Sequence, residues 1–443
     1  MTALTALYRE HIATLRSRTD AILAESGYDS LVIFAGSPKR QFLDDMDYPF
    51  KANPHFKAWL PLIEHPHCWL VVRRGALPEV IYYQPVDYWH KVAGDPDGDW
   101  VEHTVVRLIR KPDDAKTYLR NLGKAAFIGE WDGRFGEWLP GAEQNPELLL
   151  SRLHWARAVK TPYEQECVRL ANERAVRGHI AAKNSFFAGG STLDIHLDYL
   201  RAVGHMEHEL PYGNIIALNE NGAVLHYHEC TAQRFAEKDL HSFLIDAGAQ
   251  VFGYAADITR TYSYRDDEFR ALINAMDAMQ VELISTIRPG QVYTELHVDA
   301  HLRIAKILRD FDIVRMEPEA CVESNVSNTF FAHGLGHFLG LQVHDVGGHQ
   351  GTPDGAKNPP PAQHPFLRLT RRLEAGHIFT IEPGLYFIPT LLNELRKGPH
   401  AKAVNWEKVE AFLPFGGIRI EDNILVRQDG VENFTREAFR SFA

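Results

Sequence analysis

The chain has 443 residues, 45% of them hydrophobic and 24% charged, which is typical of a globular protein of two or three domains. Its net charge of −11 disfavours a nucleic-acid partner, because a surface that follows phosphates needs clustered Lys and Arg. No stretch approaches the roughly eighteen uncharged apolar residues of a membrane span, so no membrane association is expected.

The N-terminal half alternates helix and strand signals. The first 26 residues form an amphipathic pattern with Leu4, Tyr8 and Leu23 among its core positions, and they lack the features of an export signal. Short runs rich in β-branched and aromatic residues follow at residues 30–36, 67–73, 78–84 and 124–129. These runs predict an α/β domain with a mixed sheet over residues 1–158.

A helix start marks the predicted domain boundary. Thr161 is a suitable N-cap, Pro162 suits the first helical turn, and Glu164 completes a T-x-x-E capping box. A long helix is expected from this point, with Val168 and Ala171 toward the core. The second domain is therefore placed at residues 159–443.

The second half carries the pattern of antiparallel strands. Strand-like runs with turn residues between them occur at residues 213–220, 223–229, 242–250, 257–264, 377–388 and 416–427. The stretch 267–309 is helical in character and is broken by RPGQ at residues 288–291. Residues 358–362 (NPPPA) predict a surface loop. The fold class expected is α+β.

The cysteines exclude two kinds of site. The four cysteines are far apart and form no CxxC pair, so neither a disulfide framework nor a thiolate zinc site is expected. This pattern fits a protein of the reducing cytoplasm.

Four acidic residues lie inside or at the ends of apolar strand runs. They are Asp246, Asp257, Glu382 and Glu421. Burying an unpaired carboxylate is costly, and arginine partners such as Arg260 would serve only one or two of them. Four such residues together favour shared cations.

The stretch HGLGHFLGLQVHDVGGH, residues 333–349, contains four histidines. The four-residue spacing of His333 and His337 would allow a helix to present both to one zinc ion. However, Gly334, Gly336 and Gly340 interrupt the segment, at up to about 1 kcal/mol each in a helix interior, and no glutamate follows His333. A glycine-rich turn that supplies at most one metal ligand is the better interpretation.

The charges of these groups match two metal ions. Four carboxylates and one neutral imidazole carry −4, which balances two divalent cations. An oxygen-rich donor set favours Mn²⁺ or Co²⁺, with Zn²⁺ as a further alternative. Two ions about 3.5–4 Å apart would polarise a carbonyl and convert a bridging water to hydroxide near neutral pH. The pattern thus predicts a hydrolase.

The order Asp, Asp, His, Glu, Glu in these motifs resembles that of the pita-bread metallopeptidases. DAGAQVFGYAADITRTY, HGLGHFLGLQVHDVGG, TIEPGLYF and GIRIEDN carry the likeness. KRQFLDDMDYPFKANPHFKAWLP and RAVKTPYE further resemble the bacterial Xaa-Pro dipeptidases (prolidases) and the related organophosphorus acid anhydrolases. The resemblance implies a creatinase-like N-terminal domain for dimerisation and for covering the substrate site, a pseudo-twofold catalytic domain and a homodimer.

The resemblance also implies roles for individual residues. Asp246 would bind one metal, Asp257 and Glu421 would bridge both, and His337 and Glu382 would complete the ligand set of the second metal. Glu382 would also shuttle a proton. Substrate or transition-state roles fall on His226, His333, His344 and Arg419, and substrate-pocket positions on Tyr212 and Tyr293.

A dipeptidase has to bind both ends of its substrate. Arg368, Arg371, Arg372 and Arg419 are the candidates for the substrate carboxylate. Asp45, in the LDDMD segment, is a candidate for the α-ammonium in the neighbouring subunit's site, and a solvated acidic turn is the alternative.

Three other functions compete with Xaa-Pro dipeptide hydrolysis. One is an aminopeptidase P activity on longer peptides. Another is a catalytically silent binding module, which the five filled ligand positions disfavour. The third is hydrolysis of organophosphate triesters, as a side activity or as the main one.

Overall fold

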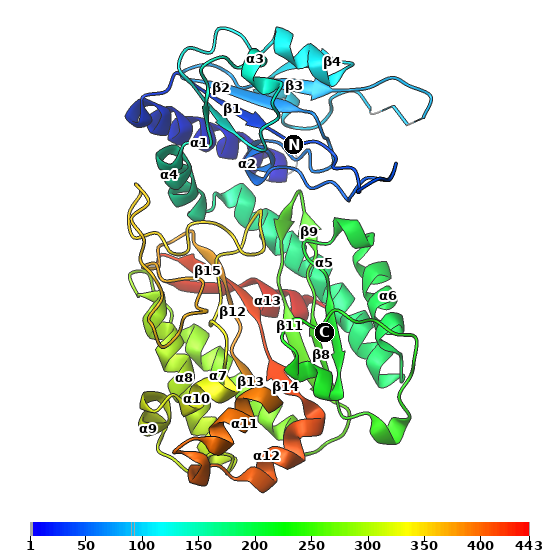
Figure 1. The fold of residues 1–443 in the computed structure, drawn as a ribbon, viewed down its shortest axis with the longest axis vertical. Coiled ribbons are helices and arrows are strands. Elements are labelled where there is room, and N and C mark those ends of the chain that lie inside the picture. The colour runs from blue at the N-terminus through cyan, green and yellow to red at the C-terminus, as the bar shows by residue number, and fades with distance from the viewer. Residues whose placement is uncertain (1–2, 90, 93, 443) are drawn as a thin grey trace. The chain divides into compact units, whose positions relative to one another are not determined.

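The structure is a computed structural model that describes residues 3–89, 91–92 and 94–442. It divides into two compact units, of which one runs to Glu166 and includes Gly351–Ala356. The other comprises Cys167–Gln350 and Lys357–Ala443 (Figure 1). None of the helices in the described part of the chain combines the length and the hydropathy that a membrane crossing needs.

The N-terminal unit is built on a six-stranded mixed sheet in the order β4-β3-β2-β1-β5-β6. β1 pairs antiparallel with β2 and parallel with β5, which confirms the predicted mixed sheet. The prediction missed β4, although its sequence VVRLI is apolar, and β6, which has only two residues. The elements are α1 (Ala3–Ser26), β1 (Ser30–Phe34), α2 (Pro54–Trp59), β2 (Trp69–Arg73), β3 (Glu79–Tyr83), β4 (Val105–Ile109), β5 (Ala125–Ile128), α3 (Phe135–Trp138), β6 (Glu143–Gln144) and α4 (Glu147–Ala158).

The capping box at Thr161 is present. Glu164 Oε2 accepts from Thr161 N at 2.8 Å, and Thr161 Oγ1 accepts from Glu164 N at 3.4 Å. Helix α5 (Pro162–Phe187) follows, and Val168 and Ala171 are buried in it as predicted.

The second unit contains two three-stranded antiparallel sheets, in the orders β11-β8-β7 and β12-β15-β16. Its elements after α5 are α6 (Thr192–Val203), β7 (Ile215–Leu218), β8 (Ser242–Asp246), β9 (Gln250–Val251), β10 (Tyr254–Ala255), β11 (Thr259–Ser263), α7 (Glu268–Ser285), α8 (Tyr293–Asp310), α9 (Pro318–Glu323), α10 (Val326–Phe330), β12 (Ile378–Ile381), β13 (Gly384–Tyr386), α11 (Pro389–Lys397), α12 (Trp406–Phe412), β14 (Gly417–Arg419), β15 (Asp422–Arg427), β16 (Gly430–Asn433) and α13 (Phe434–Ser441). The antiparallel pairing and the break between α7 and α8 confirm the predictions. The two sheets with their helices form the α+β fold.

The strand predicted at residues 223–229 is absent. Asn219 has a positive φ of 58°, which turns the chain out of β7 into a 3₁₀ helix over Asn219–Ala223. The residues that follow form an irregular segment. His226 therefore lies on an exposed loop and not in a sheet.

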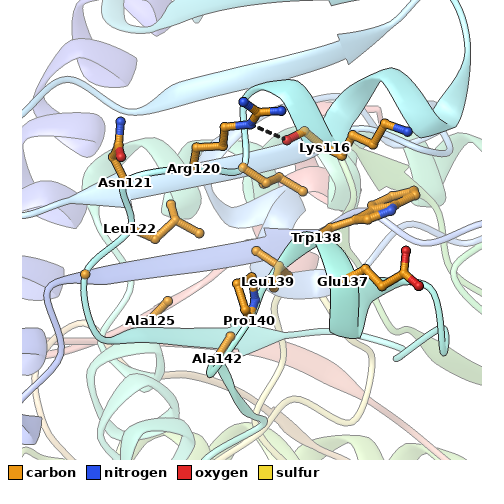
Figure 2. Close-up of a pocket in the computed structure, with 12 residues that line it drawn as sticks. Lys116, Arg120, Asn121, Leu122, Ala125, Glu137, Trp138, Leu139, Pro140 and Ala142 are labelled. Carbon is orange, nitrogen blue, oxygen red and sulfur yellow. Dashed lines mark hydrogen bonds between the residues drawn. The ribbon is translucent and has the colours of Figure 1, made fainter.

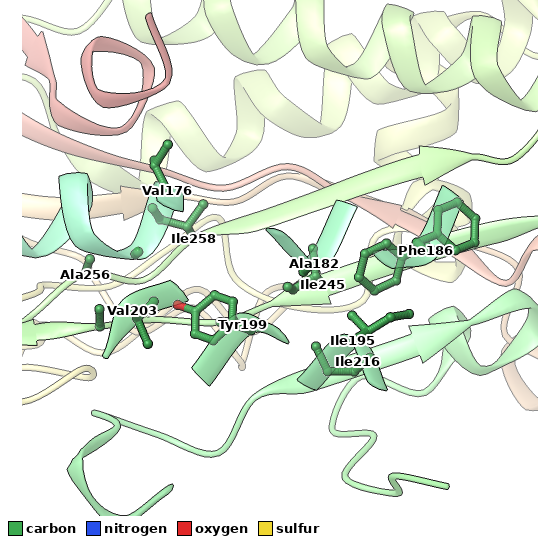
Figure 3. Close-up of a cluster of buried hydrophobic side chains, with 14 of the residues drawn as sticks. Val176, Ala182, Phe186, Ile195, Tyr199, Val203, Ile216, Ile245, Ala256 and Ile258 are labelled. Carbon is green, nitrogen blue, oxygen red and sulfur yellow. The ribbon is translucent and has the colours of Figure 1, made fainter. Parts of the chain in front are cut away.

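A buried hydrophobic cluster supports the β11-β8-β7 sheet. Figure 3 shows Phe186 from α5, Tyr199 from α6, Ile216 from β7 and Ile245 from β8 packed together with Ile258. Because side chains alternate across a strand, residues next to Ile245 and Ile258 face away from this cluster. Asp246 and Asp257 are those neighbours.

Candidate metal centre and active site

Strand pairing brings together acidic residues that are far apart in the sequence. Asp246 ends β8 and is the register partner of Thr259 in β11, two residues after Asp257. Thr259 also forms an isolated β-bridge with Glu421, which connects the two sheets. Glu382 follows β12 directly. The four carboxylates thus meet where the two sheets join.

The histidine stretch adds one imidazole to this group. The segment from His333 is irregular and not helical, so the two-histidine zinc helix is excluded. Gly336 has a φ of 157°, and a Cβ there would lie 2.1 Å from Thr380 O, so only glycine allows this close approach to β12. His337 Nδ1–H donates to Phe338 O at 3.0 Å. Its Nε2 lies 3.4 Å from Asp257 Oδ2 and 3.5 Å from Glu382 Oε1.

These five residues, Asp246, Asp257, His337, Glu382 and Glu421, are called the carboxylate cluster below. Donor atoms of Asp257, His337 and Glu421 lie within 4.8 Å of one another, and all three residues are buried. Thr259 Oγ1 donates to Glu421 Oε2 at 2.7 Å. Asp257 and Glu421 are buried, and Asp246 and Glu382 are partly buried. Four carboxylates gathered with so little solvent repel one another, so this donor set fits divalent cations.

The charges in the carboxylate cluster shift its pKa values strongly. Burial raises the pKa of Glu382 to about 7, although the charges of His337 and Arg419 oppose the shift. Burial and the charge of Asp257 also raise the pKa of Glu421. Burial opposes ionisation of Asp257, but hydrogen bonding to His337 and its charge lower the pKa of this carboxyl.

Polar partners hold Asp246 in place. Tyr212 Oη donates to Asp246 Oδ1 at 2.8 Å, and Arg419 Nη2 donates to Asp246 Oδ2 at 2.7 Å. Burial raises the pKa of Asp246, and the charge of Arg419 counteracts it. Tyr212 and Arg419 therefore contact the cluster directly.

Tyr386 is a site residue that the sequence analysis missed. Arg419 Nη1 donates to Tyr386 Oη at 3.0 Å, and Tyr386 Oη lies 2.8 Å from His333 Nε2. His333 Nδ1–H donates to Gly334 O, so its Nε2 accepts the tyrosine proton. Burial lowers the pKa of His333 to about 3, which keeps the ring neutral in this arrangement. A tyrosine four residues after Glu382, within the quoted TIEPGLYF motif, was the available signal.

Exposed side chains lie beside the buried cluster. The ring of His344 lies 4.4 Å from that of His337, and burial, His337 and Arg368 lower its pKa to about 4. A charge on His226 would lower the pKa of both His333 and His344. His226, His344 and Arg368 are solvent-exposed.

The remaining predicted site residues lie elsewhere. Tyr293 is fully buried and donates from Oη to Thr380 O at 2.9 Å, behind the Gly336 turn. Arg371 pairs with Glu374, and Arg372 donates to Gly290 O. Asp45 belongs to the N-terminal unit, on an exposed turn in which Asp44 Oδ1 accepts from its backbone N.

The N-terminal unit has a cavity of about 410 Å³ (Figure 2). Its walls include Lys116, Arg120, Glu137, Trp138 and Leu139. Arg120 Nε donates to Lys116 O at 3.4 Å. Its lining contains one carboxylate and no histidine, so it does not offer the donor set of the carboxylate cluster.

Two family models match the chain. Residues 6–155 match the N-terminal domain of Xaa-Pro dipeptidase, and residues 166–428 match metallopeptidase family M24. Among solved structures, aminopeptidase PepP of Pseudomonas aeruginosa has a TM-score of 0.74 at 21% identity, covering 96% of this chain and 95% of its own. Zn-substituted Escherichia coli aminopeptidase P with product has a TM-score of 0.73 at 23% identity, with coverage of 97% and 95%. At these identities the likeness shows the fold.

Sequence relatives match over nearly the full length. Xaa-Pro dipeptidase of Pseudoalteromonas haloplanktis is 52% identical over 98% of this chain and 99% of its own. That of Shewanella woodyi is also 52% identical, over 97% and 98% respectively. Aeromonas hydrophila Xaa-Pro dipeptidase is 50% identical over 99% and 100%. The chain therefore belongs to metallopeptidase family M24, in which it groups with the bacterial Xaa-Pro dipeptidases.

Proposed function

We propose that this chain hydrolyses Xaa-Pro dipeptides with two divalent metal ions held by the carboxylate cluster. The observation that carries the proposal is that five ligand-type side chains from five separate segments lie together, with Asp257, His337 and Glu421 buried at their centre. The substrate class is supported by full-length similarity to Xaa-Pro dipeptidases at 50–52% sequence identity.

Mn²⁺ is the proposed metal, with Co²⁺ or Zn²⁺ as alternatives. The cluster offers carboxylate oxygens and a single imidazole nitrogen, and such a set favours hard or borderline ions. When bound, the ions would polarise the scissile carbonyl and activate a water for attack. Asp246, Asp257, His337, Glu382 and Glu421 would hold them.

Glu382 is the proposed proton carrier. A bond before proline is a tertiary amide, and the ring nitrogen has to be protonated as it leaves. Glu382 is only partly buried, so its carboxylate can exchange a proton with the solvent. Tyr212, Arg419 and Thr259 would orient the ligand carboxylates through their hydrogen bonds.

Arg368 is the proposed partner of the substrate carboxylate. Arg371, Arg372 and Arg419 are engaged with Glu374, Gly290 and Asp246, whereas Arg368 is exposed and close enough to His344 to lower its pKa. His226 and His344 would donate hydrogen bonds to the substrate from the same exposed side. His333, which is bonded through both ring nitrogens, would act by positioning Tyr386. Tyr293, which packs beside the Gly336 turn, would help to shape the substrate pocket.

A homodimer is proposed from the exposed turn that carries Asp45. Phe42 and Leu43 in this turn are 89% and 91% exposed. Large apolar side chains so exposed favour burial against a partner, and Asp45 would then reach the substrate ammonium of the neighbouring subunit. The N-terminal domain, residues 1–158, would provide this contact and cover the site. The four free cysteines fit a cytoplasmic location.

A comparison of substrates tests the proposal. We expect Mn²⁺-loaded protein to cleave Ala-Pro with a kcat/KM at least about tenfold above that for Ala-Pro-Ala, because a carboxylate-binding Arg368 selects a free proline carboxylate. Preference for the tripeptide would establish an aminopeptidase P activity instead. Absence of cleavage together with absence of bound metal would establish a silent binding module.

Phosphotriester hydrolysis is proposed as a side activity. Ions held by the carboxylate cluster would supply the same activated water for a phosphoryl centre, whose tetrahedral geometry is similar to that of the peptide transition state. A kcat/KM for a phosphotriester above that for Ala-Pro would make it the main activity.

A further inference from the structure

Three buried histidines form another cluster of ligating side chains in the second unit, apart from the carboxylate cluster. His297 and His301 lie four residues apart on α8, so they share one face of the helix. His364 comes from the loop between Asn358 and Leu369. The three residues are 1%, 1% and 8% exposed, respectively. One nitrogen of each ring lies within 4.8 Å of those of the other two.

The geometry of this histidine trio is compact. The ring centroids of His297 and His301 are 4.7 Å apart, those of His297 and His364 4.4 Å, and those of His301 and His364 4.7 Å. His297 Nδ1 is buried and has no hydrogen-bond partner among the described residues. A buried imidazole nitrogen without a partner is uncommon and calls for an explanation.

The protonation state of the trio suits metal binding. Burial lowers the pKa of His297 to about 2 and that of His301 to about 3, and the neighbouring imidazoles add to both shifts. Burial also lowers the pKa of His364. All three rings are thus neutral near pH 7, and the neutral imidazole is the form that coordinates a metal.

One ring has a partner typical of metal ligands. His301 Nδ1 lies 3.0 Å from Ser327 Oγ. When Nδ1–H donates to this hydroxyl, the lone pair of Nε2 is free for coordination. Metal-binding histidines usually donate their other N–H in this way, which fixes the tautomer and the ring orientation.

We propose that His297, His301 and His364 bind one transition-metal ion of the Zn²⁺ type, at a site separate from the carboxylate cluster. Imidazole ligands suit Zn²⁺, Co²⁺, Ni²⁺ and Cu²⁺ and not the hard ions that carboxylates select. Three ring nitrogens within 4.8 Å of one another can surround a single ion, and a water would complete the tetrahedron. The inference goes beyond the proposed function and does not depend on it.

The bound ion would fasten a loop beside the active site. Gly334 packs against this loop so closely that a Cβ there would lie 2.9 Å from Leu367 Cα. The ring of Phe331 lies 4.7 Å from that of His301 and 5.0 Å from that of His333. Arg368, the proposed partner of the substrate carboxylate, is on the same loop. The ion would therefore hold Arg368 against the turn that carries His337.

Metal counting on the full-length chain tests the site. Protein is stripped of metal, loaded with excess Zn²⁺, freed of unbound ions and analysed by mass spectrometry, for the wild type, for His364→Asn and for the exposed-histidine control His208→Asn. We expect His364→Asn to hold one ion fewer than the wild type and His208→Asn to hold the same number. Equal counts in all three proteins would overturn the proposal. The readout is a difference of one ion, so it holds whether the carboxylate cluster binds two ions or none.

Cobalt spectroscopy keeps the proposal testable if His364→Asn does not fold. Four-coordinate Co²⁺ with imidazole ligands absorbs visible light much more strongly than Co²⁺ in six-coordinate carboxylate sites. We expect Co²⁺-loaded wild-type protein to show the intense band, and one equivalent of Zn²⁺ to remove it. A wild-type spectrum with only weak six-coordinate bands would overturn the proposal.

Discussion

The second unit contains two clusters of ligating side chains that differ in charge. The carboxylate cluster combines four acidic groups with one imidazole, whereas the histidine trio consists of neutral rings. Phe331 lies between His301 of the trio and His333 beside the carboxylate cluster. The anionic cluster would need cations to offset its own repulsion and would favour hard ions, while the neutral trio is stable as an aromatic contact and would favour softer ones. On this proposal, ligand charge separates the functions of two sites in one unit.

The largest expected effect is at Asp257, the carboxylate proposed to bridge the two ions. Replacing Asp257 by Asn removes one negative charge while it preserves the shape of the side chain. We expect kcat/KM for Ala-Pro to fall about a thousandfold or more, because the metal pair is lost. Steady-state kinetics at saturating Mn²⁺ measure the effect, and circular dichroism checks the fold. Near-normal turnover would refute a two-metal site and remove the distinction between the clusters.

Tyr386→Phe tests the network behind the carboxylate cluster. The change removes the hydroxyl that connects Arg419 with His333. We expect kcat to fall about 10- to 100-fold, the usual effect of removing an outer-shell partner. Tyr199→Phe is the matched control, because the Tyr199 hydroxyl is buried without a partner among the described residues and its loss should leave kcat unchanged. An equal response of the two variants would show that the network is structural.

Arg368→Gln tests substrate recognition on the loop that carries His364. We expect KM for Ala-Pro to rise about tenfold with kcat largely retained, since a charge-assisted hydrogen bond to the substrate carboxylate is lost. Arg372→Gln serves as the control, because Arg372 donates to Gly290 O. If Arg372→Gln raises KM and Arg368→Gln does not, Arg368 is not the residue that binds the substrate carboxylate.

The smallest effect concerns a buried histidine outside both clusters. His179 Nε2–H donates to Ala247 O at 2.9 Å, and burial lowers the pKa of His179 to about 3. A folded-state pKa below the unfolded value of about 6.5 gives stability that is complete above pH 6.5 and is lost as the pH falls toward 3. We expect this residue to add a slope of up to about 1.4 kcal/mol per pH unit to the unfolding free energy below pH 6.5. Urea unfolding of wild type and His179→Gln between pH 7 and 4 measures it, and identical slopes would contradict the assignment.

The sequence predicted the carboxylate cluster but not the histidine trio. Acidic residues in apolar strand runs stand out in a sequence, so Asp246, Asp257, Glu382 and Glu421 are identified from the sequence pattern alone. The HGLGH spacing suggested a zinc helix, yet Gly336 with its positive φ makes that segment an irregular turn. The helical pair four residues apart is His297 and His301, and His364 joins them only through the path of the loop.

Some elements of the fold were predicted from the sequence and others were not. Local signals sufficed for the capping box at Thr161 and for β1, β2, β3 and β5. β4 was missed although its sequence VVRLI is apolar, so its local sequence gives no reason for the miss. The strand expected at residues 223–229 was wrong because Asn219 turns the chain away from β7. Tyr386 was overlooked because its role depends on Arg419 and His333, which are distant in sequence.

Titration of the metal-free chain with Mn²⁺ tests the central claim most directly. Activity on Ala-Pro is measured against the number of ions bound per chain. We predict that activity reaches its plateau at two Mn²⁺ per chain and that Asp257→Asn shows no such rise. Full activity of the metal-free chain, or a plateau at one ion per chain, would contradict a dinuclear centre in the carboxylate cluster.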